Sequence, residues 1–535
     1  MRIAVYTMDA IGHLNPLLAL CSKLMERGHF LRFFLSSDKN EKNLEKLPFK
    51  GKFDMVRVYE DGGELSHEAF MSDIKPYEDQ TESDKKVSDI IVGMLVQSSK
   101  QMPTFLEKIK EFDCDLIIYD PFFVNAAAAA YLLNIPCVST ITFPGFNVYP
   151  IFFGKHTEEE RSVALEEYKQ SSTVSKVRDW YFENYTFDIF SNVIPSAHYF
   201  SSGLNICTGI KEFDLEMPQA VSEVYGGVDE QCLYVGPMLL TKEQGRVSSQ
   251  IVVGAKERTL LDAPFPLEEL KKYKRKGKKK VIYVSFGTVA TGLFWDMEAA
   301  PSKMLGAKTS GKEFCRTMWK RVFEAFGGND KYVVVMATVT EDPDALKGFE
   351  IPANFIVRRR CPQLDVLKVA DVFITHGGAN SMMESVSAHV PMLVLPYFAD
   401  QYENARIVSS SGSGLHYDDP VSSCTAFFLS ADIENFLNHH KSFSSNCKRL
   451  NKKLKEAGGA DKATKCIEEY VLNFRGHQPT RRLMSNGVDF FEHLLKRCDT
   501  SSWRDMSLDN SFRDSFRALS FNKTEDLDQL NFNLT

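Results

Sequence analysis

Short apolar runs alternate with longer amphipathic stretches along most of the chain. At the start, residues 2–7 are mostly apolar, residues 16–27 carry leucines at helical spacing, and residues 30–35 are apolar again. The two short runs predict strands, and the leucine-rich stretch, which stops at Gly28, predicts a helix between them. This order of strand, helix and strand is typical of a βαβ unit, so the chain is predicted to open a parallel α/β sheet.

A second unit of the same kind lies in the other half of the chain. Residues 372–375 are apolar and β-branched, a Gly-Gly turn follows, and residues 392–395 are a second buried-type run. Between these predicted strands we expect a helix over residues 382–388 with Ser381 as its N-cap. The pattern therefore predicts a second parallel sheet.

Other apolar runs complete the two predicted sheets. In the first half they predict strands over residues 115–120, 138–140, 197–201 and 233–237 and a helix over residues 125–133. In the second half they predict strands over residues 281–286, 332–337 and 354–357, an irregular insertion over 291–316 and an amphipathic helix over 448–472.

Length and composition are those of a two-domain globular protein. A chain of 535 residues is too long for one core, and 44% hydrophobic and 25% charged residues are ordinary values. We predict a first domain over residues 1–240 and a linker over 241–280, where a basic run at 271–280 favours a solvated face over a localisation or lipid patch. A second domain over 281–475 and a helix with a polar, loosely ordered tail over 476–535 follow.

Net charge and cysteine content limit the cellular compartments and the classes of partner that fit this chain. The net charge of −7 gives no support for a nucleic-acid partner, and the eleven cysteines contain no C-x-x-C pair, which suits a reducing compartment. The apolar start ends before Asp9, too early for a signal peptide, and no run reaches the ~18 apolar residues of a membrane span. We expect a cytoplasmic protein without a membrane span.

The turn after residues 372–375 has the chemistry of a phosphate site. Free backbone N–H groups and the dipole of the following helix attract an anion, and His376, Asn380 and Ser381 add side-chain donors. Glu384 lies one helical turn after Ser381, where a carboxylate can accept two ribose hydroxyls. The same spacing also fits a capping box that only closes the helix, and both interpretations stay open here.

A second glycine turn follows the predicted strand over 281–286. Gly287 lets backbone approach an anion closely. The two competing phosphate motifs, G-x-G-x-x-G and G-K-[ST] after Gly287, are absent from this turn. These absences argue against a nicotinamide or P-loop site at this turn.

The first half carries a histidine and a carboxylate at predicted strand ends. His13 follows the first strand and Asp120 ends another, at the edge where open α/β sheets bind ligands. A lone histidine is more often structural, whereas a histidine that acts as a base needs a partner to hold its tautomer. The aromatic, proline-broken residues 141–153 follow a further strand and suggest one wall of an apolar pocket, with Phe143, Phe146 and Tyr149.

Taken together, these motifs resemble the donor-nucleotide signature of the family 1 glycosyltransferases, the nucleotide-sugar enzymes of the GT-B fold. The matching residues, in order, are Pro362-Gln363, His376-Gly377-Gly378, Asn380-Ser381, Glu384, Pro391, Asp400-Gln401 and Asn404. The resemblance implies an α/β protein of two Rossmann-like domains that face each other across a cleft. The chain looks more like the soluble, macrolide-type branch of the family. The resemblance also implies a helix near Phe490 and Leu494 that crosses back onto the first domain.

The resemblance also implies the reaction and the roles of residues. His13, in a G-H-x-x-P pattern, would be the catalytic base and Asp120 its partner, and Phe143, Phe146 and Tyr149 would contact the acceptor. The implied donor-binding residues are Ser285, Gly287, Thr288, Arg360, Gln363, His376, Gly378, Asn380, Ser381, Glu384, Asp400 and Gln401. The expected enzyme inverts the configuration of the sugar and is a monomer that needs no metal or cofactor. It moves a hexose, with glucose as the expected sugar, from a UDP-sugar to a lipophilic small molecule.

Two positions depart from the family pattern. Arg360 stands where relatives have a tryptophan that stacks on uracil, so the base is open between uracil and thymine, and a guanidinium can also stack. His389 stands where relatives have glycine. Two other functions remain possible from the sequence: a nucleotide-sugar epimerase on the same fold, which needs no His13–Asp120 pair, and a non-catalytic nucleotide-sugar binder.

Overall fold

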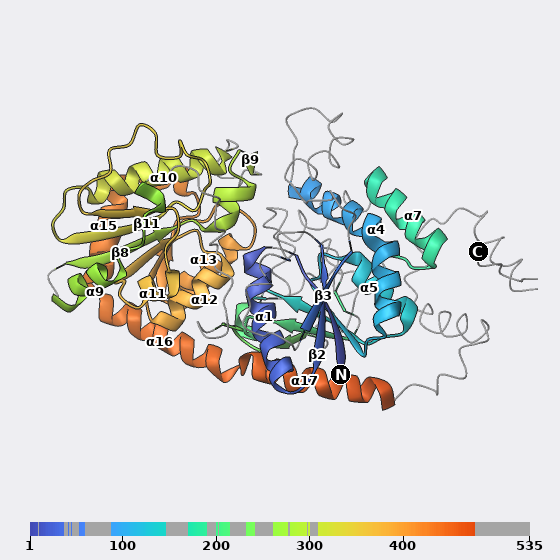
Figure 1. Ribbon diagram of the computed structural model, residues 1–535. Coiled ribbons are helices and arrows are strands. Elements are labelled where there is room, and N and C mark those ends of the chain that lie inside the picture. Colours follow the sequence, from blue (N-terminus) through green and yellow to red (C-terminus); the bar gives the residue numbers. More distant parts are fainter. Residues whose placement is uncertain are drawn as a thin grey trace, which may run out of the picture. The chain divides into compact units, whose positions relative to one another are not determined.

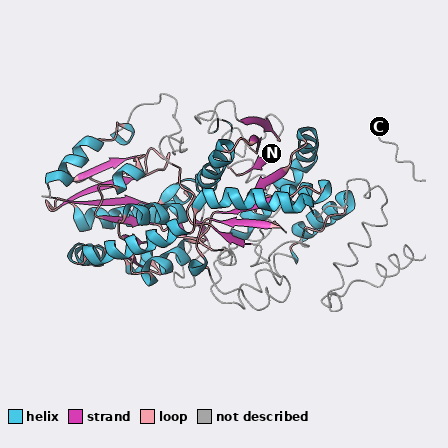
Figure 2. Ribbon diagram, turned by 90° about the horizontal axis from the view of Figure 1, so that it is seen from below, coloured by secondary structure: helices cyan, strands magenta, loops and turns pink. Residues whose placement is uncertain are grey.

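Two parallel β-sheets with helices on both faces make up the described part of the chain (Figures 1 and 2). The computed structural model describes residues 1–8, 10–36, 41, 44, 53–58, 87–145, 170–189, 200, 201, 203–214, 232–240, 260–276, 279–296, 298, 299 and 309–476. Both sheets lie in one compact unit, Met1–Phe474. The α/β class and the two-sheet architecture predicted from the sequence are confirmed.

The first sheet has seven parallel strands in the order β3-β2-β1-β4-β5-β6-β7. The strands are β1 (Arg2–Tyr6), β2 (Phe30–Leu35), β3 (Phe53–Arg57), β4 (Leu116–Tyr119), β5 (Cys137–Ile141), β6 (Leu204–Cys207) and β7 (Cys232–Tyr234). The helices are α1 (Ile11–Glu26), α4 (Val87–Phe112), α5 (Val124–Leu133) and α7 (Ser172–Tyr185), with a 3₁₀ turn over Lys211–Phe213.

Alternate residues of the central strands enter two different cores. Ile3 and Val5 of β1 pack with the leucines of α1, whereas Ala4 and Tyr6 pack with α4 and α5 on the opposite face. A strand covered on both faces needs apolar side chains at every position, which explains why β1 and β4 read as unbroken apolar runs.

The second sheet has six parallel strands in the order β12-β11-β8-β13-β14-β15. They are β8 (Lys280–Ser285), β11 (Tyr332–Ala337), β12 (Phe355–Arg358), β13 (Val372–Thr375), β14 (Met392–Val394) and β15 (Gly414–His416), and a separate antiparallel pair is formed by β9 (Glu298–Ala299) and β10 (Thr309–Ser310). The helices are α9 (Leu267–Lys276), α10 (Gly311–Phe326), α11 (Gln363–Leu367), α12 (Ala379–Ala388), α13 (Gln401–Ser410), α14 (Pro420–Ser423), α15 (Ala426–Asn438) and α16 (His440–Glu456), with a 3₁₀ turn over Leu260–Asp262 and a π-helical turn over Val289–Leu293.

The second sheet is also buried on both faces. Val284 and Ile374 pack against α10 and α15, where Trp319 is fully buried, and Tyr283 and Phe373 pack against α9, α11, α12, α13 and α16. Helix α10 begins with a capping box, in which Ser310 accepts from the backbone N–H of Glu313. The helix therefore starts inside the predicted irregular insertion, and the prediction was wrong from Gly311 on.

The last described helix joins the two sheets. Leu450 and Leu454 of α16 pack with the second sheet, and Ala463, Ile467 and Val471 of α17 (Gly459–Gly476) pack with the first, where α17 lies beside α1 in Figure 1. The crossing helix is thus α17. The prediction of one continuous helix over 448–472 was wrong, because the glycines between Glu456 and Ala460 break it. Residues 477–535, including Phe490 and Leu494, lie outside the described residues.

Several further elements differ from the sequence predictions. Strand β6 is Leu204–Cys207; residues 197–199 of the predicted strand over 197–201 lie outside the described residues, and residues 200 and 201 are not part of a strand. Strand β3 and helix α4 were not predicted. Part of the basic run forms α9, whose Leu270 is fully buried and whose Lys274 ammonium lies 2.8 Å from the Asp371 carboxylate. This part of the basic run is thus an amphipathic helix that packs Leu270 against the second sheet, while Lys272 and Arg275 are exposed, as expected of a solvated face.

None of the helices in the described part of the chain has both the length and the apolar composition of a membrane span.

The docking of α17 on the first sheet yields a stability prediction. Ile467→Ala should lower the free energy of unfolding by about 2–5 kcal/mol, because it leaves a cavity between α17 and the sheet. Leu472→Ala on the same helix is the matched control, since that side chain is 68% exposed, and it should change stability by less than about 0.5 kcal/mol. Urea unfolding measures both; equal losses would contradict the docking.

Candidate active site

His13 and Asp120 meet at the carboxyl edge of the first sheet. Strands β1 and β4 are parallel neighbours, so the segments that follow them emerge side by side. His13 Nδ1 lies 2.6 Å from Asp120 Oδ2. Helix α1 starts at Ile11 rather than near Pro16 as predicted, so His13 belongs to its first turn.

The surroundings of this pair fix the orientation of the imidazole. Asp120 is fully buried, and its other carboxylate oxygen accepts from the backbone N–H of Phe122 (3.2 Å). An ionised carboxylate only accepts hydrogen bonds, so His13 Nδ1 donates and Nε2 keeps a free lone pair. Thr142 Oγ1 lies 3.3 Å from the same Nδ1. The histidine is therefore held in the tautomer that a general base requires.

Aromatic rings stand beside the histidine. Phe122 and Phe143 lie edge-on to the His13 ring, with centroid distances of 5.6 and 5.9 Å. Phe143 was among the predicted acceptor residues, whereas Phe146 and Tyr149 lie outside the described residues. Phe122 and Thr142 were not predicted as site residues. Their positions carried a signal, because Phe122 follows β4 and Thr142 follows its neighbour β5.

In the second sheet, an imidazole is enclosed by two glycine turns at the point where the strand order reverses. The turns follow the neighbouring strands β8 and β13, after Ser285 and Thr375. A Cβ on Gly287 or Gly378 would lie 2.4 or 2.5 Å from His376 Nε2, and Gly287 has φ +74°. Burial lowers the pKa of His376 to about 4, against a backbone hydrogen bond at Ser285 that raises it. His376 is thus a neutral group near pH 7.

Helix α12 starts earlier than predicted and leaves its first N–H groups without a side-chain cap. Its N-cap is Gly378, which has no side chain that could cap the helix. The chain turns at Gly377 (φ +83°) and becomes helical at once. Ser381 therefore lies inside the first turn and is not the N-cap. The capping-box interpretation of Ser381 and Glu384 was wrong.

Glu384 belongs instead to a polar cluster with Gln363. Gln363 Nε2 donates to Glu384 Oε2 (2.8 Å) and to Ser381 Oγ (3.3 Å), and Gln363 Oε1 accepts from the Tyr283 hydroxyl (3.0 Å). The predicted donor residues 363, 381 and 384 are thus brought together. Gln363 is engaged at both ends of its amide, and it orients the Glu384 carboxylate, which is buried at 5% exposure.

Asn380 reaches from the second sheet to the first. Its Nδ2 donates to the backbone carbonyl of Gly12 (3.0 Å), the residue before His13. The predicted donor side chain therefore contacts the segment that carries the proposed base. Thr288, by contrast, is exposed at the start of the π-helical turn and makes no side-chain cap.

Asp400 and Gln401 follow β14 and differ in their surroundings. Gln401 Oε1 accepts from the backbone N–H groups of Tyr397 (2.9 Å) and Phe398 (3.2 Å), so this carbonyl closes a turn. Asp400 Oδ2 accepts from Asn404 Nδ2 (2.7 Å). Burial raises the pKa of Asp400 to about 6, although the Asn404 bond and the charge of His13 act in the opposite direction.

The two departures from the family pattern have structural explanations of different kinds. His389 is the left-handed C-cap of α12, with φ +60°, a conformation that glycine adopts without strain, and its Nε2 lies 3.1 Å from Asn451 Nδ2. Arg360 forms an ion pair with Glu341, a residue that the sequence did not single out. Stacking of Arg360 on a base stays a prediction.

The raised pKa of Asp400 makes stability depend on pH. A carboxyl whose pKa rises on folding from 3.8 to about 6 favours the folded state at low pH, and this contribution is lost as the pH rises through about 6. Between about pH 4 and about pH 6 the wild type should therefore lose about 2 kcal/mol relative to Asp400→Asn. Unfolding curves across this range measure the difference. The control Asp330→Asn, at a fully exposed carboxylate, should show the same pH dependence of stability as the wild type. The same pH dependence in the wild type and Asp400→Asn would contradict the raised pKa of Asp400.

Comparison with known proteins agrees with this geometry. The family model for UDP-glucoronosyl and UDP-glucosyl transferases matches residues 261–485. The NDP-glycosyltransferase YjiC of Bacillus subtilis is 26% identical over 472 residues, which span 88% of this chain and 97% of the relative. An anthocyanidin 3-O-glucosyltransferase of Hordeum vulgare is 35% identical over 150 residues, 28% of each chain.

Solved structures show the same fold. The glycotransferase of kitacinnamycin superposes with a TM-score of 0.61 at 20% identity, over 88% of this chain and 98% of that one. The calicheamicin glycosyltransferase CalG4 gives 0.57 at 19% identity, over 88% and 98%. The protein is a glycosyltransferase with the GT-B fold, and its residues 261–485 match the family of UDP-glucoronosyl and UDP-glucosyl transferases.

Proposed function

We propose that this glycosyltransferase moves a hexose, glucose by the family resemblance, from a UDP-sugar to a hydroxyl of a lipophilic small molecule, with inversion and as a monomer. The observation that carries the proposal is the hydrogen bond of 2.6 Å between His13 Nδ1 and the buried Asp120 carboxylate. A nucleotide-sugar epimerase or a passive binder has no need of such an oriented base, so the pair favours transfer over both alternatives.

The proposed reaction is a single displacement at the anomeric carbon. His13 Nε2 takes the proton of the acceptor hydroxyl while that oxygen forms its bond to the carbon, and Asp120 stabilises the imidazolium. The bond from the carbon to the β-phosphate oxygen breaks, and UDP leaves with the electron pair. One displacement from the opposite side inverts the configuration.

The donor side is proposed to hold the nucleotide mainly through backbone groups. The uncapped N–H groups at the start of α12 and the turn at Gly287 meet the charge that develops on the diphosphate. Neutral His376 adds a hydrogen-bond donor rather than a full charge. Glu384, oriented by Gln363, accepts the ribose hydroxyls, and Asp400 accepts a sugar hydroxyl; no cofactor or metal takes part in this proposal.

The acceptor is proposed to be an aromatic or otherwise apolar alcohol or phenol. Phe122 and Phe143, edge-on to His13, form an apolar wall beside the base. The barley relative acts, by its name, on an anthocyanidin, a compound of this kind. Turnover of lipophilic phenols, sterols and alcohols with labelled UDP-glucose tests both the donor and the acceptor class.

The catalytic pair gives the central prediction. His13→Ala should lower kcat by roughly 10²–10⁴, because general-base catalysis is lost, and should leave the affinity for UDP nearly unchanged. Asp120→Asn should lower kcat as well, and the two losses should be far from additive because both residues act as one unit.

The matched control for the carboxylate is Asp113→Asn, at the other end of β4, where a left-handed residue (φ +48°) suits asparagine. It should keep wild-type kinetics. Single-turnover kinetics with UDP-glucose separates the chemical step from binding. Full activity of His13→Ala would remove the proposed mechanism, and losses that multiply in the double variant would show two independent roles.

A second prediction concerns donor binding. Glu384→Ala should weaken UDP binding by about 1–3 kcal/mol, since hydrogen bonds from the ribose to an ionised group are lost. Glu434→Ala, an exposed helical glutamate of the same domain, should leave the affinity unchanged. Calorimetry with UDP gives the affinity and a melting curve gives the stability. Unchanged UDP affinity in a folded Glu384→Ala protein would exclude the ribose contact.

A further inference from the structure

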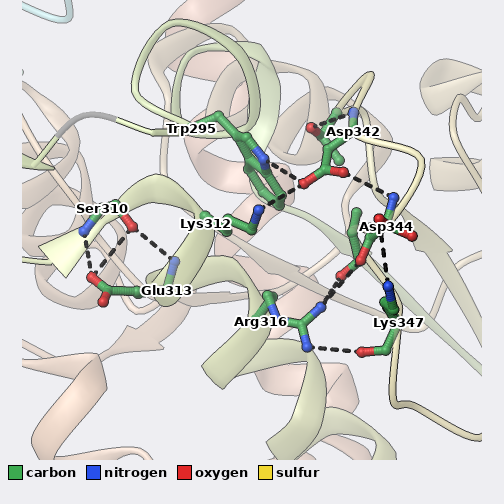
Figure 3. Close-up of polar contacts among 10 residues, drawn as sticks. Trp295, Ser310, Lys312, Glu313, Arg316, Asp342, Asp344 and Lys347 are labelled. Atoms are coloured by element: carbon green, nitrogen blue, oxygen red, sulfur yellow. Dashed lines mark hydrogen bonds and ion pairs between the residues drawn. The ribbon is translucent and has the colours of Figure 1, made fainter.

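The loop that follows β11 is fastened to the start of α10 (Figure 3). Asp342 Oδ2 accepts from Trp295 Nε1 (3.0 Å) and lies 3.0 Å from the Lys312 ammonium. One helical turn further along α10, Arg316 donates to the backbone carbonyl of Ala345 (2.6 Å). Bonds from three side chains hold the outer part of this loop in one position.

The inner part of the same loop is a strained turn held by the end of β12. Val339 has φ +62°, and the N–H of Thr340 donates to the carbonyl of Thr338 (2.7 Å), which makes a γ-turn of the rare kind. The N–H of Val339 donates to the carbonyl of Arg359 (2.8 Å), and Arg359 Nη1 donates to the carbonyl of Thr340. Backbone strain of this kind persists only where the surrounding structure enforces it. Here the strained turn sets the direction in which the chain leaves β11.

The fastened loop places Glu341 beside Arg360. Arg360 Nη2 donates to Glu341 Oε1, and the other carboxylate oxygen lies 3.7 Å from Arg359 Nη1. Arg360 Nη1 is buried and has no hydrogen-bond partner in the described part of the chain, and the same holds for Thr338 Oγ1. A buried donor without a hydrogen-bond partner is unfavourable. The unpaired Nη1 group of Arg360 therefore indicates a hydrogen-bond acceptor that arrives with a ligand.

Arg360 lies close to the proposed ribose site along the chain. Arg360 follows β12 directly, and three residues later Gln363 holds the Glu384 carboxylate. The base of a nucleotide is attached to its ribose, so a base bound at this sheet edge comes next to Glu384. Arg360 and Glu341 are charged side chains that the fold fixes there, next to buried Arg359, which pairs with Asp262.

We propose that Arg360 and Glu341 read the edge of the donor's base, and that they select a pyrimidine with a carbonyl group next to an imide N–H. The guanidinium donates to the C4 carbonyl oxygen, and the carboxylate accepts from N3–H, a pattern that uracil and thymine share. Cytosine has an amino group at C4 and a bare N3, so both contacts become repulsive. This inference rests on the proposed function and replaces stacking by Arg360 with an edge-on contact.

Binding of UDP and CDP to the full-length protein tests the inference. The wild type should bind UDP at least about tenfold more tightly than CDP. Glu341→Gln should reduce this preference at least about fivefold, because a glutamine amide can also donate to the bare N3 of cytosine. Glu350→Gln makes the same charge change on an exposed residue near the end of the loop and should keep the wild-type preference.

A second variant protects the test against a folding defect. Arg360→Lys keeps the positive charge but has no second fixed N–H, so it should weaken UDP and leave CDP nearly unchanged. Equal affinities of the wild type for UDP and CDP would overturn the inference, and so would a full preference retained in folded Glu341→Gln or Arg360→Lys protein. If neither nucleotide binds, the proposed donor site itself fails, which is a different result from equal binding.

Discussion

Strands that are buried on both faces decide where polar chemistry can occur in this protein. Within β1, β4, β8 and β13 every side chain is buried except Arg2 and Lys280, which begin their strands, so a charged or hydrogen-bonding group is tolerated mainly where a strand ends. Parallel pairing then brings the carboxyl ends of neighbouring strands together. His13 with Asp120, and His376 with Gly287, are two results of the same constraint, one in each sheet.

Much of the site could be predicted for this reason. Asp120 and His13 follow apolar runs that only a buried strand explains, and Gly287 and Gly378 mark turns at the ends of two others. The sequence could not indicate that Gly378 would cap α12, since Ser381 is the better capping residue by type. The structure favours Gly378 because Gly377 has already turned the chain, so local preference gives way to the path between β13 and α12.

The failures of prediction have two origins: contacts that are distant along the chain, and weak periodic signals. Helix α17 is amphipathic, but nothing in its own residues says that Ile467 packs on the first sheet rather than the second. Glu341 and Arg360 are each ordinary charged residues, and only the pairing of β11 with β12 makes them neighbours. Strand β3 and helix α4 were missed because a half-polar edge strand and a helix interrupted by Pro103 carry weak periodic signals.

Helix α12 connects catalysis to the packing of the second domain. Its amino end carries the uncapped N–H groups that we propose for the diphosphate, and Asn380 in its first turn donates to Gly12 beside His13. Met382, Met383 and Val386 hold the helix against the sheet, and left-handed His389 ends it. Because these contacts fix both the tilt and the length of the helix, the direction of the anion-binding groups is a property of the core. Donor affinity should therefore respond to packing changes under α12 as well as to changes in the site.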